Sequence, residues 1–323
     1  MCSVAIYRNK SSTHLYSQST INKFHVPYLL KIWLWSIISL SVLAMVFWKV
    51  FERYRIDAAQ LIIEELDVLP LVTTVVLLSM NYSLEAVKWN LLTYSIERVS
   101  FLRSLRTILI GQALNMIIPL AFGDFYARYR QFKECKSQSL GAIMVNRITL
   151  TIPTFIFGTV AVLYWMRLTL EGIELLWCIA ISTVGVIILF LTIRLVKPLF
   201  LQKYASAIMD IKLSLLFKVQ GLALARYIVF TIQYLLVFQA LRFELTYIEM
   251  FLGVAWVFLI KTIIPAITLF GDLAKRQLSA LAFFTLITDR VDLVIATSFL
   301  VWLINIVFPS FIGLIILPRQ LSR

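Results

Sequence analysis

Two short passages of the sequence share the same order of chemically active residues. Each carries an aspartate followed four positions later by an arginine, Asp124 and Arg128 in the first and Asp272 and Arg276 in the second. Residues four apart share one face of a helix, so each pair can form an ion pair. Such a pair either binds a polar group or braces a helix end, and the spacing leaves both interpretations open.

A helix-breaking pattern accompanies each pair. Pro119 and Gly123 stand before the first pair, and Pro265 and Gly271 stand before the second. Proline removes a backbone donor and frees carbonyl groups, and glycine permits a turn or a close approach of backbones. The letters IIP and FGD recur in the same order, although two extra residues precede Phe270 in the second copy. The pattern predicts an internal repeat, and a chance match in apolar sequence is the alternative.

Four further polar residues lie inside or beside apolar runs: Asn115, Arg147, Asp289 and Arg290. Ionisable side chains within a membrane are costly, which makes them candidates for function. An arginine offers a two-pronged donor that suits a phosphate, although either arginine could instead extend to the membrane surface. Asp289 is a candidate partner of Arg290 or a proton site, and Asn115 would bind a head group or satisfy a broken backbone.

Lys88 stands beside Trp89 near the end of an apolar run. This arrangement is typical of an anchor at the membrane interface. Glu85 lies three positions earlier on the same predicted helix, so it can pair with Lys88.

The high apolar content of the chain indicates that these polar and charged residues lie on membrane helices. Hydrophobic residues make up 61% of the chain and charged residues 15%, and the mean hydropathy is +0.89. A soluble domain has about 45–50% apolar and about 25% charged residues. Runs of roughly 18 apolar residues cross a bilayer. The sequence therefore predicts an all-α, polytopic helical bundle in a membrane.

The positions of the charged residues predict which segments cross the membrane, which enter it only partway and which face the cytoplasm. The basic tail, residues 1–31, predicts a cytoplasmic N-terminus, because positive loops stay inside. The segment 107–123 is short, contains Pro119 and has basic flanks, so we expect it to be re-entrant from the cytoplasmic side. Spans are expected at residues 32–48, 68–89, 140–165, 175–193, 222–241 and 293–318, with three shorter segments at 250–260, 262–271 and 277–288.

One membrane domain, residues 32–318, accounts for most of the chain, with a short tail at 319–323. Its halves, about 68–166 and 222–318, are joined by an amphipathic stretch at 194–220 that we expect on the inner surface. Broken hydrophobic segments in two halves are typical of transport sites. We expect the two copies to be inverted, with their broken tips near each other and with Arg147 and Arg290 facing one cavity.

The first half resembles the flippase-like membrane domain of the lysylphosphatidylglycerol synthases. The residues that carry this resemblance are 85–92, 106–111, 115–119, Gly123-Asp124, Arg128 and Arg147. In the second half, Pro265, Gly271 and Arg290 resemble the family's proline, glycine-rich turn and trailing arginine. The family's second turn usually has a double glycine followed by glutamate, where this chain has Gly271 and Asp272.

The resemblance implies a lipid-handling membrane protein that moves a charged or glycosylated lipid between leaflets. The full synthases also carry a soluble aminoacyltransferase domain, and we expect no counterpart of it in residues 1–323. We therefore expect no aminoacylation of lipids by this chain alone.

Charge, cysteine and histidine positions argue against nucleic-acid binding, metal binding and histidine catalysis. The net charge of +13 is better explained by loops facing anionic lipid than by nucleic-acid binding. Cys2, Cys135 and Cys178 form no CxxC, and both histidines, His14 and His25, lie in the tail. We therefore expect no metal site, no cofactor and no histidine catalysis in the membrane.

Three functions remain open. The first is transport of a phospholipid or polyprenyl-phosphate lipid across the cell's cytoplasmic membrane without a chemical step. The second is an enzyme acting on a lipid phosphate, for which Glu85, Asp124, Asp272 and Asp289 are the available acids. The third is a non-catalytic partner of envelope lipid or glycan biosynthesis proteins.

Overall fold

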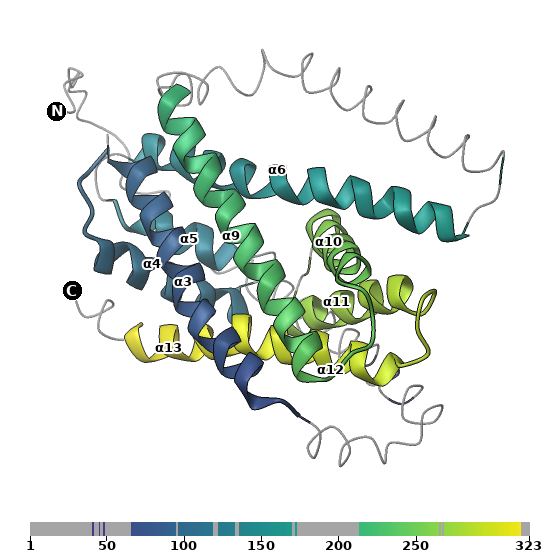
Figure 1. Ribbon diagram of the computed structural model, residues 1–323. Helices are drawn as coiled ribbons and strands as arrows, with labels where there is room; N and C mark the ends of the chain where they lie inside the picture. Colours follow the sequence, from purple (N-terminus) through teal and green to yellow (C-terminus); the bar gives the residue numbers. More distant parts are fainter. Residues whose placement is uncertain are drawn as a thin grey trace, which may run out of the picture.

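Every regular element in the described part of the chain is a helix (Figure 1). The computed structural model describes residues 66–94, 96–118, 122–132, 136–169, 213–264 and 268–317, with a few isolated positions besides. Helices satisfy all their backbone polar groups internally, which the interior of a membrane requires. The expected all-α bundle is confirmed.

Four long apolar helices in the described ranges have the length and composition to cross a membrane. They match the predicted spans 68–89, 140–165, 222–241 and 293–318, the last two of which were placed one and two residues past the helix ends, and the chain is a multi-pass membrane protein. The predicted spans 32–48 and 175–193 lie outside the described residues. The four helices are α3 (Val68–Thr93), α6 (Lys136–Thr169), α9 (Leu213–Ala240), and the continuous run of α12 (Val291–Trp302), η2 (Leu303–Val307) and α13 (Phe308–Ile316).

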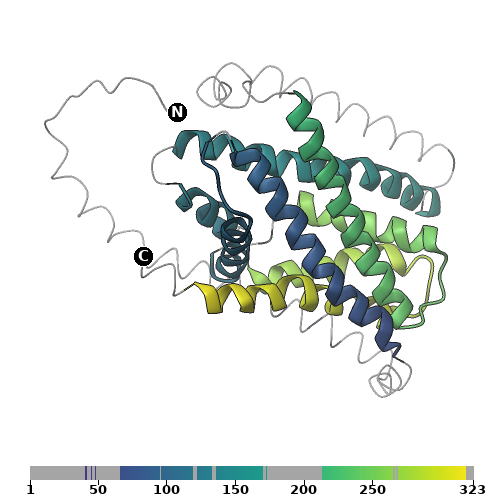
Figure 2. The same cartoon turned by 60° about the vertical axis from the view of Figure 1, so that its left-hand side comes forward.

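Helices α3 and α9 lie side by side and antiparallel (Figures 1 and 2). The backbone N–H of Asp67, before α3, donates to the carbonyl of Ala240 at the end of α9, at 2.9 Å. Residues 213–220, which the sequence assigned to the surface connector, instead form the first turns of α9. Residues 194–212 lie outside the described part.

Two short helices, α4 (Phe101–Ile117) and α5 (Phe122–Arg130), form a helical hairpin. A side chain added at Gly123 would overlap the α4 backbone at Leu114 and Asn115, so the two helices touch there. The segment 107–123 is therefore broken, as predicted, rather than one crossing helix. Its first helix begins six residues earlier, where Ser100 caps α4 by accepting from the Arg103 N–H at 3.4 Å. Entry from the cytoplasmic side stays a prediction.

A second helical hairpin is formed by α10 (Tyr247–Ile263) and α11 (Leu269–Phe284). The indole N–H of Trp256 on α10 donates to the Ser279 carbonyl on α11 at 2.9 Å. On α10, Gly253 faces the ring of Phe284, which leaves no room for a side chain. This pair packs against α9 and α12 through a buried aromatic cluster.

The expected division into segments 250–260, 262–271 and 277–288 is wrong. Lys261 lies inside α10, and Asp272 and Arg276 lie inside α11. The break falls between Ile263 and Leu269, an interval that contains Pro265. Proline interrupts the backbone hydrogen bonds, whereas charged side chains remain in these helices.

Candidate functional site

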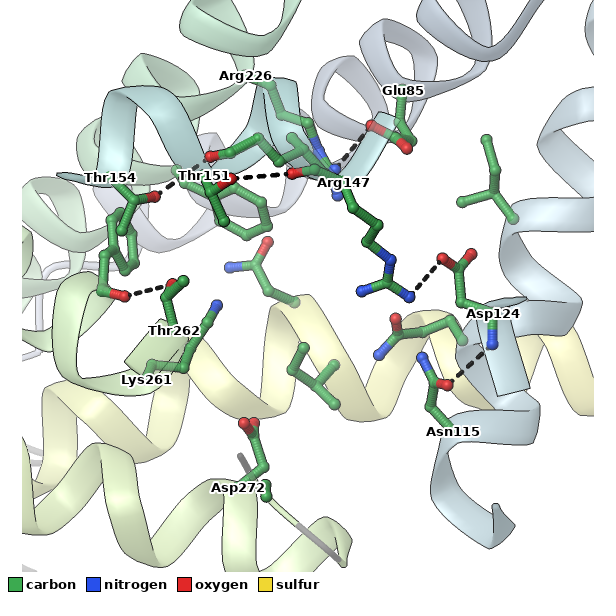
Figure 3. A pocket seen from close by; sticks show the side chains of 18 of the residues that line it. Glu85, Asn115, Asp124, Arg147, Thr151, Thr154, Arg226, Lys261, Thr262 and Asp272 are labelled. Atoms are coloured by element: carbon green, nitrogen blue, oxygen red, sulfur yellow. Dashed lines mark hydrogen bonds and ion pairs between the residues drawn. The ribbon is translucent and has the colours of Figure 1, made fainter. Parts of the chain in front are cut away.

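A cavity of about 540 Å³ is lined by both helical hairpins and by α3, α6, α9 and η2 (Figure 3). This volume is within the range of about 300–1,000 Å³ typical of small-ligand sites. Amides and hydroxyls supply further polar groups, including Gln112, Asn115, Thr151, Thr154 and Thr262. The charged lining residues are six basic and three acidic ones: Arg128, Arg147, Arg226, Lys261, Lys275, Arg276, Glu85, Asp124 and Asp272.

Glu85 on α3 is the centre of a buried charge cluster, with a side chain only 1% exposed. Its Oε2 lies 2.9 Å from Lys88 Nζ and 2.8 Å from an Arg226 nitrogen. Its Oε1 accepts from Arg128 at 2.7 Å and from the Asn146 amide at 3.0 Å. One carboxylate thus holds three cations, and a buried charge is tolerated only when it is paired in this way.

Asp124 on α5 extends this cluster to the cavity. Its Oδ1 accepts from Arg128 Nε at 2.9 Å, so the predicted pair forms. Its Oδ2 accepts from Arg147 at 3.0 Å, and its backbone N–H donates to the Asn115 side chain at 2.9 Å. The Arg128 guanidinium also lies 4.6 Å from the centre of the Trp89 ring, which is a cation–π contact. Arg147 keeps 47% of its side chain exposed, so it remains accessible from the cavity that it lines.

A second cluster surrounds Asp272 on α11. Arg276 Nε donates to its Oδ2 at 2.7 Å, which is the second predicted pair, and Lys275 Nζ lies 3.4 Å from its Oδ1. Lys275 also donates to the carbonyls of Lys261 and Ile264, at 3.0 and 3.1 Å. These carbonyls belong to the open end of α10, where the last turn has no partners within the helix. Lys275 therefore holds the broken end of α10 against α11.

The cavity collects six of the residues selected from the sequence: Asn115, Asp124, Arg128, Arg147, Asp272 and Arg276. Asp289 and Arg290 are not among its lining residues.

The expectation that Arg147 and Arg290 share the cavity is wrong for Arg290. This residue is the N-cap of α12 and is 64% exposed at its side chain. It pairs at 3.3 Å with Asp292, not with Asp289, because Asp292 lies in the first turn of the helix that Arg290 precedes.

Of the four residues expected to break helices, the structure describes the two glycines. Gly123 and Gly271 lie in the first turns of α5 and α11 rather than in the turns between helices. The Gly271 N–H donates to the Thr268 hydroxyl, which caps α11, at 3.0 Å. Pro119 and Pro265 lie outside the described residues.

Three cationic residues have roles that the sequence predicted only in part, and of these the Glu85–Lys88 pair is confirmed at 2.9 Å. Arg226 joins Glu85 to Asn81, with 2.7 Å between its Nε and the Asn81 Oδ1. Its signal was available, since an arginine within an apolar helix was the criterion that selected Arg147. Lys88 is fully buried, so its interpretation as an interfacial anchor is wrong. Lys261, which falls between two of the segments predicted from the sequence, lines the cavity.

Comparison with known families gives a match over most of the chain. A model of the lysylphosphatidylglycerol synthase TM region matches residues 36–316. The chain belongs to this family. No curated protein and no solved structure matches the chain significantly. Membership of the lysylphosphatidylglycerol synthase TM family confirms the resemblance seen in the sequence and makes the chain a membrane protein of a lipid-related family.

Proposed function

We propose that this protein moves a lipid with an anionic, phosphate-bearing head group between membrane leaflets, without a chemical step. The observation that carries the proposal is the composition of the cavity, where six basic side chains face three acidic ones inside a bundle of membrane helices. The surplus of positive charge favours an anionic guest. Threonine and amide side chains would bind hydroxyl groups of a glycerol or sugar attached to the phosphate.

The two faces of α6 support this interpretation. Arg147 and Thr151 line the cavity, whereas Ile148 and Ile152 are 54% and 41% exposed on the outer apolar surface. A lipid whose head group occupied the cavity would keep its acyl chains among such apolar side chains. A phospholipid and a polyprenyl phosphate both have this combination of charged head and apolar tail. We place the protein in the cytoplasmic membrane, with its N-terminus inside.

An enzyme acting on a lipid phosphate is less well supported. Such a reaction needs a general base or a nucleophile. Glu85, Asp124 and Asp272 each already accept from two or more cations. A carboxylate held in this way is a weak base. No comparable contact favours a purely structural partner of envelope biosynthesis proteins.

Vesicles test transport and chemistry together. Purified protein is reconstituted with a head-group-labelled phosphatidylglycerol, and a membrane-impermeant quencher reports the label that reaches the outer leaflet. We expect faster appearance than in protein-free vesicles, with the lipid recovered unchanged. Chemical conversion of the lipid would favour the enzyme instead. If the lipid neither moves nor changes chemically, both functions are contradicted.

Two arginines provide a matched comparison in the same assay. Arg147 pairs with Asp124 and Arg290 pairs with Asp292, but only Arg147 lines the cavity. Arg147→Gln should slow the movement of label, whereas Arg290→Gln should leave it close to the wild-type rate. Equal slowing by both variants would argue against this cavity as the route.

A further inference from the structure

Lys261 differs from the other cations of the cavity. Arg128, Arg147 and Arg226 are held by Glu85 or Asp124, as given above, and Lys275 and Arg276 are held by Asp272. Lys261 forms no ion pair with any carboxylate in the described ranges. The nearest aromatic partner of its ammonium group is Phe258 on the same helix, with 5.5 Å from Nζ to the ring centre.

Lys261 lies in a different part of the cavity from Arg147. Figure 3 shows Lys261 and Asp272 on one side of the pocket and Asn115 and Asp124 on the other, with the Arg147 side chain directed toward Asp124. The cavity therefore has two cationic regions. One is contributed by α5 and α6 and contains Arg147, and the other is contributed by α10 and α11 and contains Lys261.

The total charge indicates how many negative charges a guest should bring. Three carboxylates neutralise three of the six cations of the lining, which leaves an excess of three positive charges. A phosphodiester head group carries one negative charge and would leave part of this excess uncompensated. A phosphomonoester carries about −1.5 to −2 near neutral pH, and a diphosphate carries more. Uncompensated charge is costly in a membrane interior, so the better match is a guest with several negative charges.

We propose that the cavity selects lipids whose head groups carry two or more negative charges, such as a lipid diphosphate, and that Lys261 binds the second anionic group. This inference rests on the proposed function, because it assumes that a lipid head group enters the cavity. In this arrangement Arg147 contacts one anionic group and Lys261 contacts the other. Lys261 is thus a specificity-determining residue, whereas Arg128, Arg226 and Arg276 stay bound to their carboxylate partners.

Binding of two matched lipids tests the proposal. Dioctanoyl phosphatidylglycerol and dioctanoylglycerol diphosphate have identical acyl chains and differ only in the head group, which is a singly charged phosphoglycerol in the first and a multiply charged diphosphate in the second. Titration calorimetry of the full chain in detergent should show the diphosphate lipid binding about tenfold more tightly, which is the effect of one charge-assisted contact. Lys261→Gln should remove most of this preference and leave the affinity for phosphatidylglycerol within about threefold. Lys261→Arg, which keeps the charge, should retain the preference.

The control is Lys218→Gln, the same change at an exposed lysine of α9 that does not line the cavity. It should behave as the wild type does. Equal affinity of the wild-type protein for the two lipids would contradict the proposed selectivity. It would not contradict the proposed transport of anionic lipids. A preference that survives in a folded Lys261→Gln protein would overturn the role of Lys261. Failure of both lipids to bind the wild type would contradict the proposed function itself.

Discussion

At the scale of single residues, Glu85 organises the charged interior. It contacts residues from four different helices, counting its own: Lys88, Arg128, Asn146 and Arg226. Loss of its negative charge would leave three cations close together in a buried place. Removing one partner of a buried charge pair costs about 3–5 kcal/mol.

Glu85→Gln should therefore destabilise the protein strongly. We expect the free energy of unfolding to fall by about 3–5 kcal/mol, seen as a large drop of the unfolding temperature in detergent. The control is Glu97→Gln, which breaks the Glu97–Arg103 pair, where both side chains are 45% exposed. An exposed pair is worth less than about 1 kcal/mol. Similar losses in the two variants would contradict the account of Glu85.

The sequence could predict contacts between residues close in the chain, but not the charge cluster around Glu85. Asp124 pairs with Arg128, and Asp272 with Arg276, because helical periodicity alone brings residues four apart together. The partners of Glu85 lie 43, 61 and 141 residues away for Arg128, Asn146 and Arg226. Such distances are closed only by packing between helices, which a single sequence does not encode in any local pattern.

At the scale of elements, the two helical hairpins shape the cavity. In each, the chain reverses between two short helices, and a polar contact ties the second helix to the first. Asp124 bonds to Asn115 in one, and Lys275 bonds to the open end of α10 in the other. The prolines of the sequence correctly indicated both reversals. The π-helical turn that brings Asn305 to the cavity had no such signal, although π turns are frequent at functional sites.

Gly123→Ala should separate the first helical hairpin. The added methyl group would overlap the α4 backbone at Leu114 and Asn115, and backbone cannot move aside as a flexible side chain can. We expect a lower unfolding temperature and slower lipid movement in vesicles. Gly221→Ala in α9 is the control, because nothing lies within 4 Å of the added methyl group. That change should be neutral or stabilise the helix by roughly 0.5–1 kcal/mol. A harmless Gly123→Ala would show that the close contact is unimportant.

At the scale of the whole molecule, the cavity joins the two halves of the chain. Asn115 from the first half and Thr268 from the second both line it, and the close approach of the two broken tips stays a prediction. The start of α3 and the end of α9 lie on the same side of the bundle, as the Asp67–Ala240 hydrogen bond requires. Loop charges then predict that this side is the outer one and that the basic loop before α4 is cytoplasmic. The inverted relation of the two hairpins remains a prediction.

Single-cysteine labelling tests this orientation. In a cysteine-free background, a cysteine at Glu244, just after α9, should react with a membrane-impermeant maleimide in intact cells. A cysteine at Glu97, before α4, should react only after the membrane is permeabilised. The reverse pattern would place the basic loops outside and would contradict the predicted topology.

In the proposed function, lipid head groups pass through the cavity, so blocking the cavity should stop transport. Cys2, Cys135 and Cys178 are replaced by serine, and a single cysteine is introduced either at Thr151, which lines the cavity, or at the neighbouring Ile152, which is 41% exposed on the outer surface. Each protein is reconstituted in vesicles and treated with a negatively charged methanethiosulfonate. We expect modification to stop lipid movement in the Thr151→Cys protein and to leave it unchanged in the Ile152→Cys protein. Undiminished movement after complete modification at Thr151 would contradict the proposed function.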